Sequence, residues 1–287
     1  MVKVVAFLFL LLLGYLINQK FTPRKGKEII RQFIIFFGLP ILVLHSILSQ
    51  EKIEFGLTAL VIATSLILNV ILSRIGNKSL NFRNGGTLLL LNSFSNAGFL
   101  GLPFCWILFG SQGLHYGSLY VLVGILIHYT VGIAGALEVE RKEIRDTFRF
   151  PATWIFVLIL VLIVFGVKFP PSLMNVFNYI GEVTLVLSLF YIGLNLERPE
   201  NFKEFYRETL YVGAFRFLIS PLIVFLPLVF LKISGFQIIA FQAMMPPAIA
   251  NTIIASHFGL NEKLSANVTT ILTIVFLLIF LLIKIIS

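Results

Sequence analysis

The polar and helix-breaking residues of Asn92–Pro103 could bind a small polar ligand, because they stand where a membrane helix would carry apolar side chains. The stretch reads NSFSNAGFLGLP and lies inside the uncharged run from Asn84 to Leu137. Asn and Ser side chains donate and accept hydrogen bonds. Interrupted backbone survives at membrane depth only where it lines a cavity or is buried by protein. We therefore interpret this stretch as part of a binding site.

A second interruption is predicted in Gln242–Thr252, which reads QAMMPPAIANT. Pro246 and Pro247 lack the amide hydrogen that a helix uses. In the first stretch, Gly98 and Gly101 are expected to let the chain unwind. Pro103 is expected to begin a second half-helix, and the amino ends of half-helices attract anions. The candidate substrate-binding residues are Asn92, Ser95, Asn96, Gly98, Pro103, Gln242, Pro246, Pro247, Asn251 and Thr252.

Ionisable side chains at membrane depth are functional candidates by default. Glu182 could bind a coupling cation or proton, and Arg216 could attract an anionic substrate. Alternatively, these two side chains pair with each other, or Glu182 reaches the outer interface. His128 is either a proton relay or a packed, hydrogen-bonded residue. Asn69 could line the cavity or bridge helices, and we expect it to bridge helices.

The composition is that of an all-α integral membrane protein. Of 287 residues, 58% are hydrophobic and 12% charged, with a mean hydropathy of +0.99, whereas soluble domains have about 25% charged residues. The single cysteine, Cys105, excludes a disulfide within the chain and a cysteine-based metal site. We expect no cofactor beyond a sodium ion or proton as coupling ion. The basic stretch at residues 20–31 indicates an anionic lipid surface rather than nucleic acid.

Ten apolar segments are predicted to be membrane-spanning helices. The loops after the first, third, fifth, seventh and ninth segments, counted with adjoining residues at the segment ends, hold 16 of the 22 Lys and Arg residues. Because basic loops stay in the cytoplasm, we expect a multi-pass protein of the cell (plasma or inner) membrane with both termini non-cytoplasmic. The segments are 2–18, 30–48, 55–73, 85–109, 114–136, 150–167, 173–196, 209–231, 236–258 and 264–286.

The chain is predicted to contain an internal repeat. A shift of 149 residues places each of the first five segments on one of the last five and Phe109-Gly110 on Phe258-Gly259. Because five is odd, the second half would enter the membrane from the opposite face, as in many secondary transporters. The predicted parts are a first five-helix repeat (1–137), a short cytoplasmic linker (138–149) and a second, inverted repeat (150–287).

Three patches resemble the auxin efflux carrier family of transporters, which belongs to the bile-acid/sodium symporter-like superfamily. They read NSFSNAGFLGLPF with a following FG, FFGLPILV, and MMPPAIANTIIASHFGL. The resemblance implies that broken helices 4 and 9 cross in a transport core of helices 3–5 and 8–10. It also implies a scaffold of helices 1, 2, 6 and 7 that dimerises, elevator-type movement, and small organic anions such as auxin or malonate as substrates. Asn96, Pro103, Pro246, Pro247 and Asn251 match the crossover residues.

The sequence thus predicts a secondary transporter that exports a small organic anion. The alternative is a sodium-coupled uptake symporter for amphipathic organic anions on the same fold. A non-transporting membrane sensor is a more remote alternative. An intramembrane enzyme is not expected, because the chain has no HExxH, GxSxG or GxGD pattern and no pair of carboxylates inside the spans.

Overall fold

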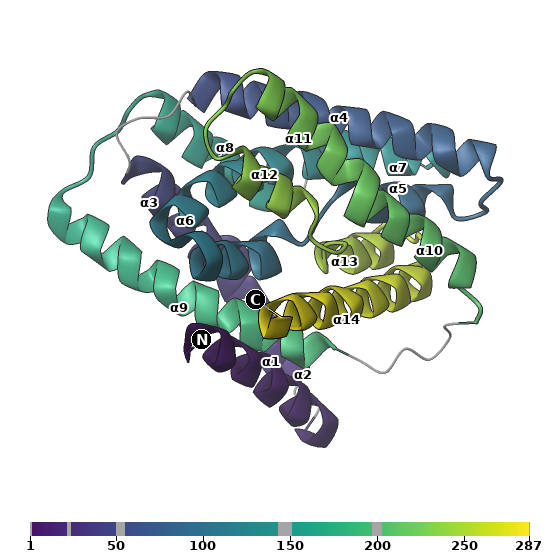
Figure 1. Ribbon diagram of the computed structural model, residues 1–287, viewed down its shortest axis with the longest axis horizontal. Coiled ribbons are helices and arrows are strands. Elements are labelled where there is room, and N and C mark those ends of the chain that lie inside the picture. Colours follow the sequence, from purple (N-terminus) through teal and green to yellow (C-terminus); the bar gives the residue numbers. More distant parts are fainter. Residues whose placement is uncertain (1, 22–23, 50–54, 143–150, 197–202, 287) are drawn as a thin grey trace. The chain divides into compact units, whose positions relative to one another are not determined.

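The computed structural model describes residues 2–21, 24–49, 55–142, 151–196 and 203–286. Within these ranges the chain is helical, apart from turns, short connections and one isolated bridge (Figure 1). The all-helical membrane class is therefore confirmed. Most of the predicted linker 138–149 lies outside the described residues. Six stretches of the described residues are long and apolar enough to cross a bilayer: Lys25–Leu48, Phe55–Ser79, Ala97–Val139, Pro171–Asn195, Tyr206–Phe230 and Glu262–Ile283.

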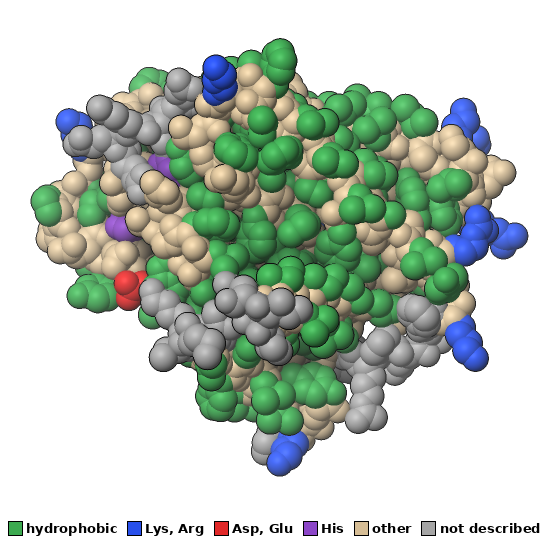
Figure 2. Space-filling view, in the orientation of Figure 1, with side chains coloured by type: hydrophobic (Ala, Val, Ile, Leu, Met, Phe, Trp, Pro, Cys, Tyr) green, Lys and Arg blue, Asp and Glu red, His purple; other side chains and the backbone are tan. Residues whose placement is uncertain are grey.

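The surface also suits a bilayer. Figure 2 shows hydrophobic side chains over much of one face, with Lys and Arg side chains at its margins. Phe230 and Phe165 are 86% and 79% exposed. Exposed apolar side chains in such number would promote aggregation in water, whereas lipid chains solvate them. Two shorter apolar helices, Val5–Lys20 and Pro151–Val164, add to the six long stretches.

The chain divides into two compact units. The first unit comprises Met1–Gly56, Ala97–Leu126 and Phe150–Glu197. Some of its helical segments are π-helical, with hydrogen bonds between residues i and i+5, and these carry the letter η. The elements of the first unit are α1 (Val2–Phe21), α2 (Arg24–Phe33), η1 (Ile34–Gly38), α3 (Leu39–Leu48), η2 (Ala97–Gly101), α6 (Leu102–Ile127, which ends one residue beyond the unit), α8 (Pro151–Val164) and α9 (Pro171–Asn195).

Close backbone contact holds α1 against α9 in the first unit (Figure 1). Gly14 of α1 and Gly193 of α9 face each other. A Cβ atom built on Gly14 would lie 2.3 Å from the carbonyl oxygen of Phe190, and one built on Gly193 would lie 2.1 Å from that of Leu11. Small residues allow such approach between membrane helices, where dispersion replaces the hydrophobic effect as the main attraction.

The second helix begins earlier than the sequence predicts. Arg24–Phe33 was expected to be largely loop, but it is helical and continues through η1 into α3. Glu28 accepts hydrogen bonds from Arg31 and Gln32, three and four residues later. Such pairs stabilise polar helices. Pro40 is the second residue after η1, and a π-helical turn at this place relieves the clash that proline makes with the preceding turn.

The second unit comprises Leu57–Asn96, Ile127–Arg149 and Arg198–Ser287. A buried apolar cluster that includes Leu88, Val212 and Leu264 joins its helices. Its elements are α4 (Phe55–Ser79, of which the first two residues belong to the first unit), α5 (Gly85–Ser93), η3 (His128–Gly132), α7 (Ile133–Val139), α10 (Tyr206–Ala214), η5 (Phe215–Ile219), α11 (Ser220–Phe230), α12 (Phe236–Ala243), α13 (Ala250–His257) and α14 (Glu262–Ile286).

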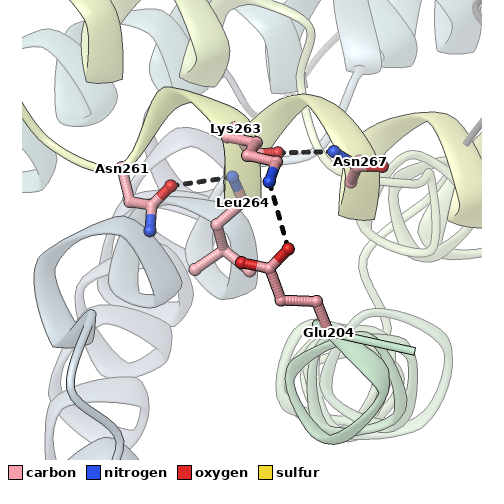
Figure 3. A network of polar contacts seen from close by, with 5 residues as sticks. All are labelled: Glu204, Asn261, Lys263, Leu264 and Asn267. Carbon is pink, nitrogen blue, oxygen red and sulfur yellow. Dashed lines mark hydrogen bonds and ion pairs between the residues drawn. The ribbon is translucent and has the colours of Figure 1, made fainter. Parts of the chain in front are cut away.

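Polar contacts gather the connecting segments at one end of the second unit. Figure 3 shows the ion pair between Lys263 and Glu204, with Nζ and Oε2 3.1 Å apart, beside the start of α14. There the side-chain oxygen of Asn261 accepts a hydrogen bond from the amide of Leu264 and caps the helix. The other contacts are the Arg74–Glu138 ion pair, the hydrogen bond from Lys142 to the carbonyl oxygen of Phe258, and the Arg207 guanidinium over the Phe82 ring.

The exposed Lys263–Glu204 pair is expected to add little stability. Both side chains are more than half exposed, and exposed ion pairs contribute at most about 1 kcal/mol. Lys263→Ala should therefore lower the Tm of the detergent-purified protein by less than about 4 °C. The difference from wild type should shrink further in 1 M salt, where screening is strong. A larger, salt-resistant loss would contradict this view of the pair.

Candidate functional site

Two helices of the second unit are interrupted, each at a place where the sequence predicts a break. The helix α5 ends at Ser93 and gives way to extended backbone, with φ −120° and ψ 116° at Phe94. The helix α12 ends at Ala243, and α13 begins only at Ala250. Pro246 and Pro247 stand between them, where neither can donate a helical hydrogen bond.

The two interruptions meet and pair with each other. The amide of Asn96 donates to the carbonyl oxygen of Pro246 at 2.8 Å, and the amide of Ala248 donates to that of Phe94 at 3.0 Å. Ser95 and Pro247 form an isolated antiparallel bridge between these two bonds. The unwound backbone thus finds partners inside the protein, as backbone at membrane depth must.

Two predicted asparagines fasten the crossing to its surroundings. Asn251 Nδ2 donates to the carbonyl oxygen of Leu90 at 3.1 Å and lies 3.4 Å from that of Phe94. Leu90 lies in the last turn of α5, and Phe94 follows the last residue of that helix. Asn92 Nδ2 donates to Ser73 Oγ of α4 at 2.9 Å. Both side chains are buried, and both amide nitrogens donate to oxygens of the protein.

Other polar atoms beside the interruptions have no hydrogen-bond partner among the described residues. They include Ser93 Oγ, Ser95 Oγ, Asn92 Oδ1, Asn96 Nδ2, Asn251 Oδ1 and both side-chain polar atoms of Gln242. Ser93, Asn96 and Gln242 are buried. Most buried polar groups in proteins are paired with protein or water, so a group of free donors and acceptors at one place needs an explanation. Such atoms can receive a polar ligand or ordered water.

The remaining predicted residues of the second unit lie in mixed surroundings. Thr252 Oγ1 shares a hydrogen bond of 3.1 Å with Ser265 Oγ of α14. His128 is buried and stacks on Phe94, with ring centroids 4.0 Å apart. The imidazole therefore lies against the first interruption. This contact fits the packed alternative for His128 and leaves its role as a proton relay a prediction.

Three predicted residues belong to the first unit. Gly98 and Pro103 continue the chain directly beyond the crossing, in η2 and α6, whereas Glu182 of α9 is exposed and accepts a hydrogen bond from Asn178. The prediction that Gly98 and Gly101 supply unwound backbone is wrong: both lie in η2, and neither has positive φ. Instead, a Cβ on Gly98 would lie 3.1 Å from Leu39 Cδ2, so this glycine permits close packing.

Arg216 is fully buried at the crossing. It lies in η5, and its guanidinium donates to the carbonyl oxygens of Asn92, Ala243 and Met245 and to Ser220 Oγ. These carbonyls come from the ends of α5 and α12. The sequence singled Arg216 out for its charge at membrane depth, but its binding partners depend on the tertiary fold.

Four buried polar residues form a stripe along one face of α4, and only one of them, Asn69, was identified from the sequence. Asn69 Nδ2 donates to Ser220 Oγ at 3.2 Å, so the prediction that Asn69 bridges helices is confirmed. The spacing of four residues could have identified the whole stripe, since it keeps side chains on one helical face. The stripe consists of Ser65, Asn69, Ser73 and Asn77, all buried.

An apolar hollow of about 440 Å³ adjoins the second interruption. Residues of η5, α11 and α12 line it together with Met244, the first residue after α12. Its lining includes one polar side chain, Gln237. None of the predicted binding residues is among its lining, so the hollow lies beside the crossing rather than within it.

Comparisons with known proteins agree with this description. A family model described as "Membrane transport protein" matches residues 1–143 and 135–284. A protein named an uncharacterized transporter from Methanocaldococcus jannaschii is 25% identical over 290 residues, covering 95% of this chain and 94% of its own. Another uncharacterized transporter, from Methanothermobacter thermautotrophicus, is 24% identical over 298 residues, which cover 95% of this chain and 94% of its own. The uncharacterized transporter YfdV of Escherichia coli K12 is 25% identical over 58% of this chain and 56% of its own.

Proposed function

Because the chain belongs to the membrane transport protein family, that of the auxin efflux carriers, we propose that it is a secondary transporter exporting a small organic anion. The family and the relatives indicate a transporter rather than an enzyme. The observation that carries the proposal is the crossing, where Asn96 and Gln242 carry buried polar atoms without protein partners among the described residues. Substrate sites of secondary transporters are typically formed by such discontinuous helices.

The binding site would consist of both interruptions. Asn96 Nδ2 and the Gln242 amide offer donors to a carboxylate, and Ser95 Oγ offers a hydroxyl. Arg216 would add positive charge at the carboxyl ends of α5 and α12, where it contacts backbone oxygens. Asn92 and Asn251 would hold the framework rather than the ligand, since their amide groups already donate to protein oxygens. His128, against Phe94, and Glu182 remain candidates for proton or cation coupling.

The fold would be two inverted five-helix repeats with ten spans. Helix bounds support this proposal, since the shift of 149 residues carries α5 (Gly85–Ser93) to 234–242, close to α12 (Phe236–Ala243). The same shift superposes Gly110 on Gly259, and both have positive φ, of 59° and 60°. A left-handed turn at matched places would end the fourth span of each repeat. Contacts that gather the connecting segments of the second unit at one end agree with the predicted alternation of loops.

Transport would proceed by movement of a core against a scaffold, as in an elevator. The scaffold would contain the first, second, sixth and seventh predicted spans, at residues 2–18, 30–48, 150–167 and 173–196. It would hold a homodimer together in the cell membrane, with both termini outside. An anion that leaves the cytoplasm moves down the inside-negative potential, which contributes about 2.3 kcal/mol per charge per 100 mV. Export would therefore need no coupling ion.

The alternative is sodium-coupled uptake of an amphipathic anion. The apolar hollow beside Met244 favours a ligand with an apolar part. Replacing sodium by choline in the transport assay separates the two, because only uptake by symport requires the ion. Binding of a carboxylate without any flux would instead indicate a membrane sensor.

Flux through proteoliposomes tests the proposal. A panel of radiolabelled mono- and dicarboxylates should identify a substrate that wild-type protein moves. Asn96→Ala and Gln242→Leu should each lower that flux about tenfold, since a hydrogen bond to a charged group is worth about 1.5–3 kcal/mol. Asn77→Ala is the matched control, because Asn77 is buried but donates to Gly85 at the far end of α5.

Flux should be normalised to folded protein, since each of these changes also affects packing. Unchanged flux in both Asn96→Ala and Gln242→Leu would remove the crossing from the proposed mechanism. Loss of flux in Asn77→Ala as well would show that any buried polar change is enough, and the assignment of the site would fail.

A further inference from the structure

Arg216 joins the carboxyl ends of two half-helices. Its Nη1 donates to the carbonyl oxygen of Asn92 at 2.9 Å, near the end of α5. Its Nη2 donates to that of Ala243, the last residue of α12, and its Nε to that of Met245 at 3.1 Å. Helix ends of this kind present carbonyl oxygens without helical partners.

These carbonyl ends need a cation. Each helix carboxyl end behaves like about half a negative charge, and two such ends approach each other within the reach of one guanidinium. Water cannot screen them, since Arg216 is fully buried. In discontinuous membrane helices, unwound carbonyls and half-helix carboxyl ends are the groups that coordinate sodium ions.

We propose that the Arg216 guanidinium is a built-in cation that occupies the place of a sodium ion at the crossing, so that the protein binds no sodium there. The consequence for ion coupling rests on the proposed transport function: anion movement is then independent of sodium. We call the carbonyl oxygens of Asn92, Ala243 and Met245 the carbonyl cage. Whether Arg216 fills this cage does not depend on transport and can be tested on the purified protein.

Neighbouring groups position the guanidinium. Ser220 Oγ lies 3.2 Å from Nη1 and 3.5 Å from the carbonyl oxygen of Ala243. Asn69 Nδ2 of α4 in turn donates to Ser220 Oγ at 3.2 Å. A planar fork of five donors suits several carbonyls at fixed angles, which a lysine ammonium on a flexible stem does not. The cage therefore selects arginine over lysine.

The first measurement uses wild-type protein in detergent. Its Tm is compared in 150 mM sodium chloride, potassium chloride and choline chloride, at constant ionic strength. A filled cage predicts the same Tm in all three salts. A saturable rise in Tm with sodium alone would overturn the proposal, and this measurement requires no variant to fold.

The second measurement empties the cage. Arg216→Met should lower the Tm by about 10 °C, because it leaves buried carbonyl ends without a cation. Arg216→Lys should fall between this variant and wild type. Arg207→Met is the matched control: Arg207 lies in α10, in the same helical stretch, but is exposed over Phe82, and its Tm should stay near that of wild type. An Arg216→Met protein as stable as wild type would also overturn the proposal.

The third measurement refills the cage. Arg216→Ala should regain part of the lost Tm with about 20 mM guanidinium chloride or with sodium chloride, relative to choline chloride, while wild type should not respond. No response of this variant to either cation would contradict the cage. These measurements distinguish this proposal from the proposed function. If the wild-type protein moved no anion but the Tm of Arg216→Ala rose with added cation, the transport function alone would be rejected.

Discussion

Ala248→Pro is expected to abolish transport. The amide of Ala248 donates to the carbonyl oxygen of Phe94 at 3.0 Å, and this is one of two backbone bonds that join the interruptions. Proline removes the donor and puts a ring carbon in the place of the hydrogen. That carbon would press on the Phe94 oxygen and drive the two segments apart. A displacement of about 1 Å in a positioned site can cost about a hundredfold in rate, so flux should fall at least that far.

A substitution that keeps the amide provides the control. Ala248→Gly retains the backbone N–H that donates to the carbonyl oxygen of Phe94 and removes only a methyl group. Ala248→Gly should therefore keep most of the flux. Both variants should elute as monodisperse protein before reconstitution. Wild-type flux in Ala248→Pro would mean that pairing of the interruptions is not needed for transport.

The sequence predicted the positions of the interruptions because their cause is local. Pro246 and Pro247 cannot continue a helix whatever surrounds them. Most of the apolar segments begin and end within a few residues of helices for the same reason. The exceptions are Arg24–Phe33 and the predicted gap after residue 109, which lies inside α6 at the kink of Gly110. At Arg24–Phe33, polar composition suggested a loop, but local Glu28 pairs favour a helix.

The partners of the site residues could not be predicted from the sequence. Asn92 and Asn251 were expected to hold ligand, yet their amide groups donate to Ser73 Oγ and to the Leu90 carbonyl oxygen. Those partners are distant in sequence and meet only through tertiary packing. Gly98 shows the same limit: glycine allows unwinding, but it also allows close approach, and only its packing against Leu39 distinguishes the two.

Arg216 is intermediate between these cases. A charge at membrane depth is visible in the sequence and indicates an important position. Whether it faces a carboxylate, a substrate or backbone oxygens depends on where α5 and α12 end. The bonds described for Arg216 lead to backbone oxygens and Ser220, and its pairing with Glu182 stays a prediction.

Gly193→Ala is expected to destabilise the first unit severely. The added Cβ would lie 2.1 Å from the carbonyl oxygen of Leu11 and 3.0 Å from the amide nitrogen of Tyr15. Both are backbone atoms, so no change of rotamer relieves the clash and α1 must move away from α9. Overpacking of this kind costs about 1–3 kcal/mol or more, so the Tm should fall by at least about 5 °C. Gly193→Val should yield little monodisperse protein.

Gly56→Ala separates this clash from a general effect of removing glycine. Gly56 lies in the first turn of α4, and no atom of the described residues lies within 4 Å of a Cβ built there. Alanine also favours helix over glycine by up to about 1 kcal/mol, so the Tm of Gly56→Ala should equal or exceed that of wild type. A Gly193→Ala protein with wild-type Tm would mean that α1 and α9 are not held in backbone contact. Their approach would then not be what stabilises the first unit.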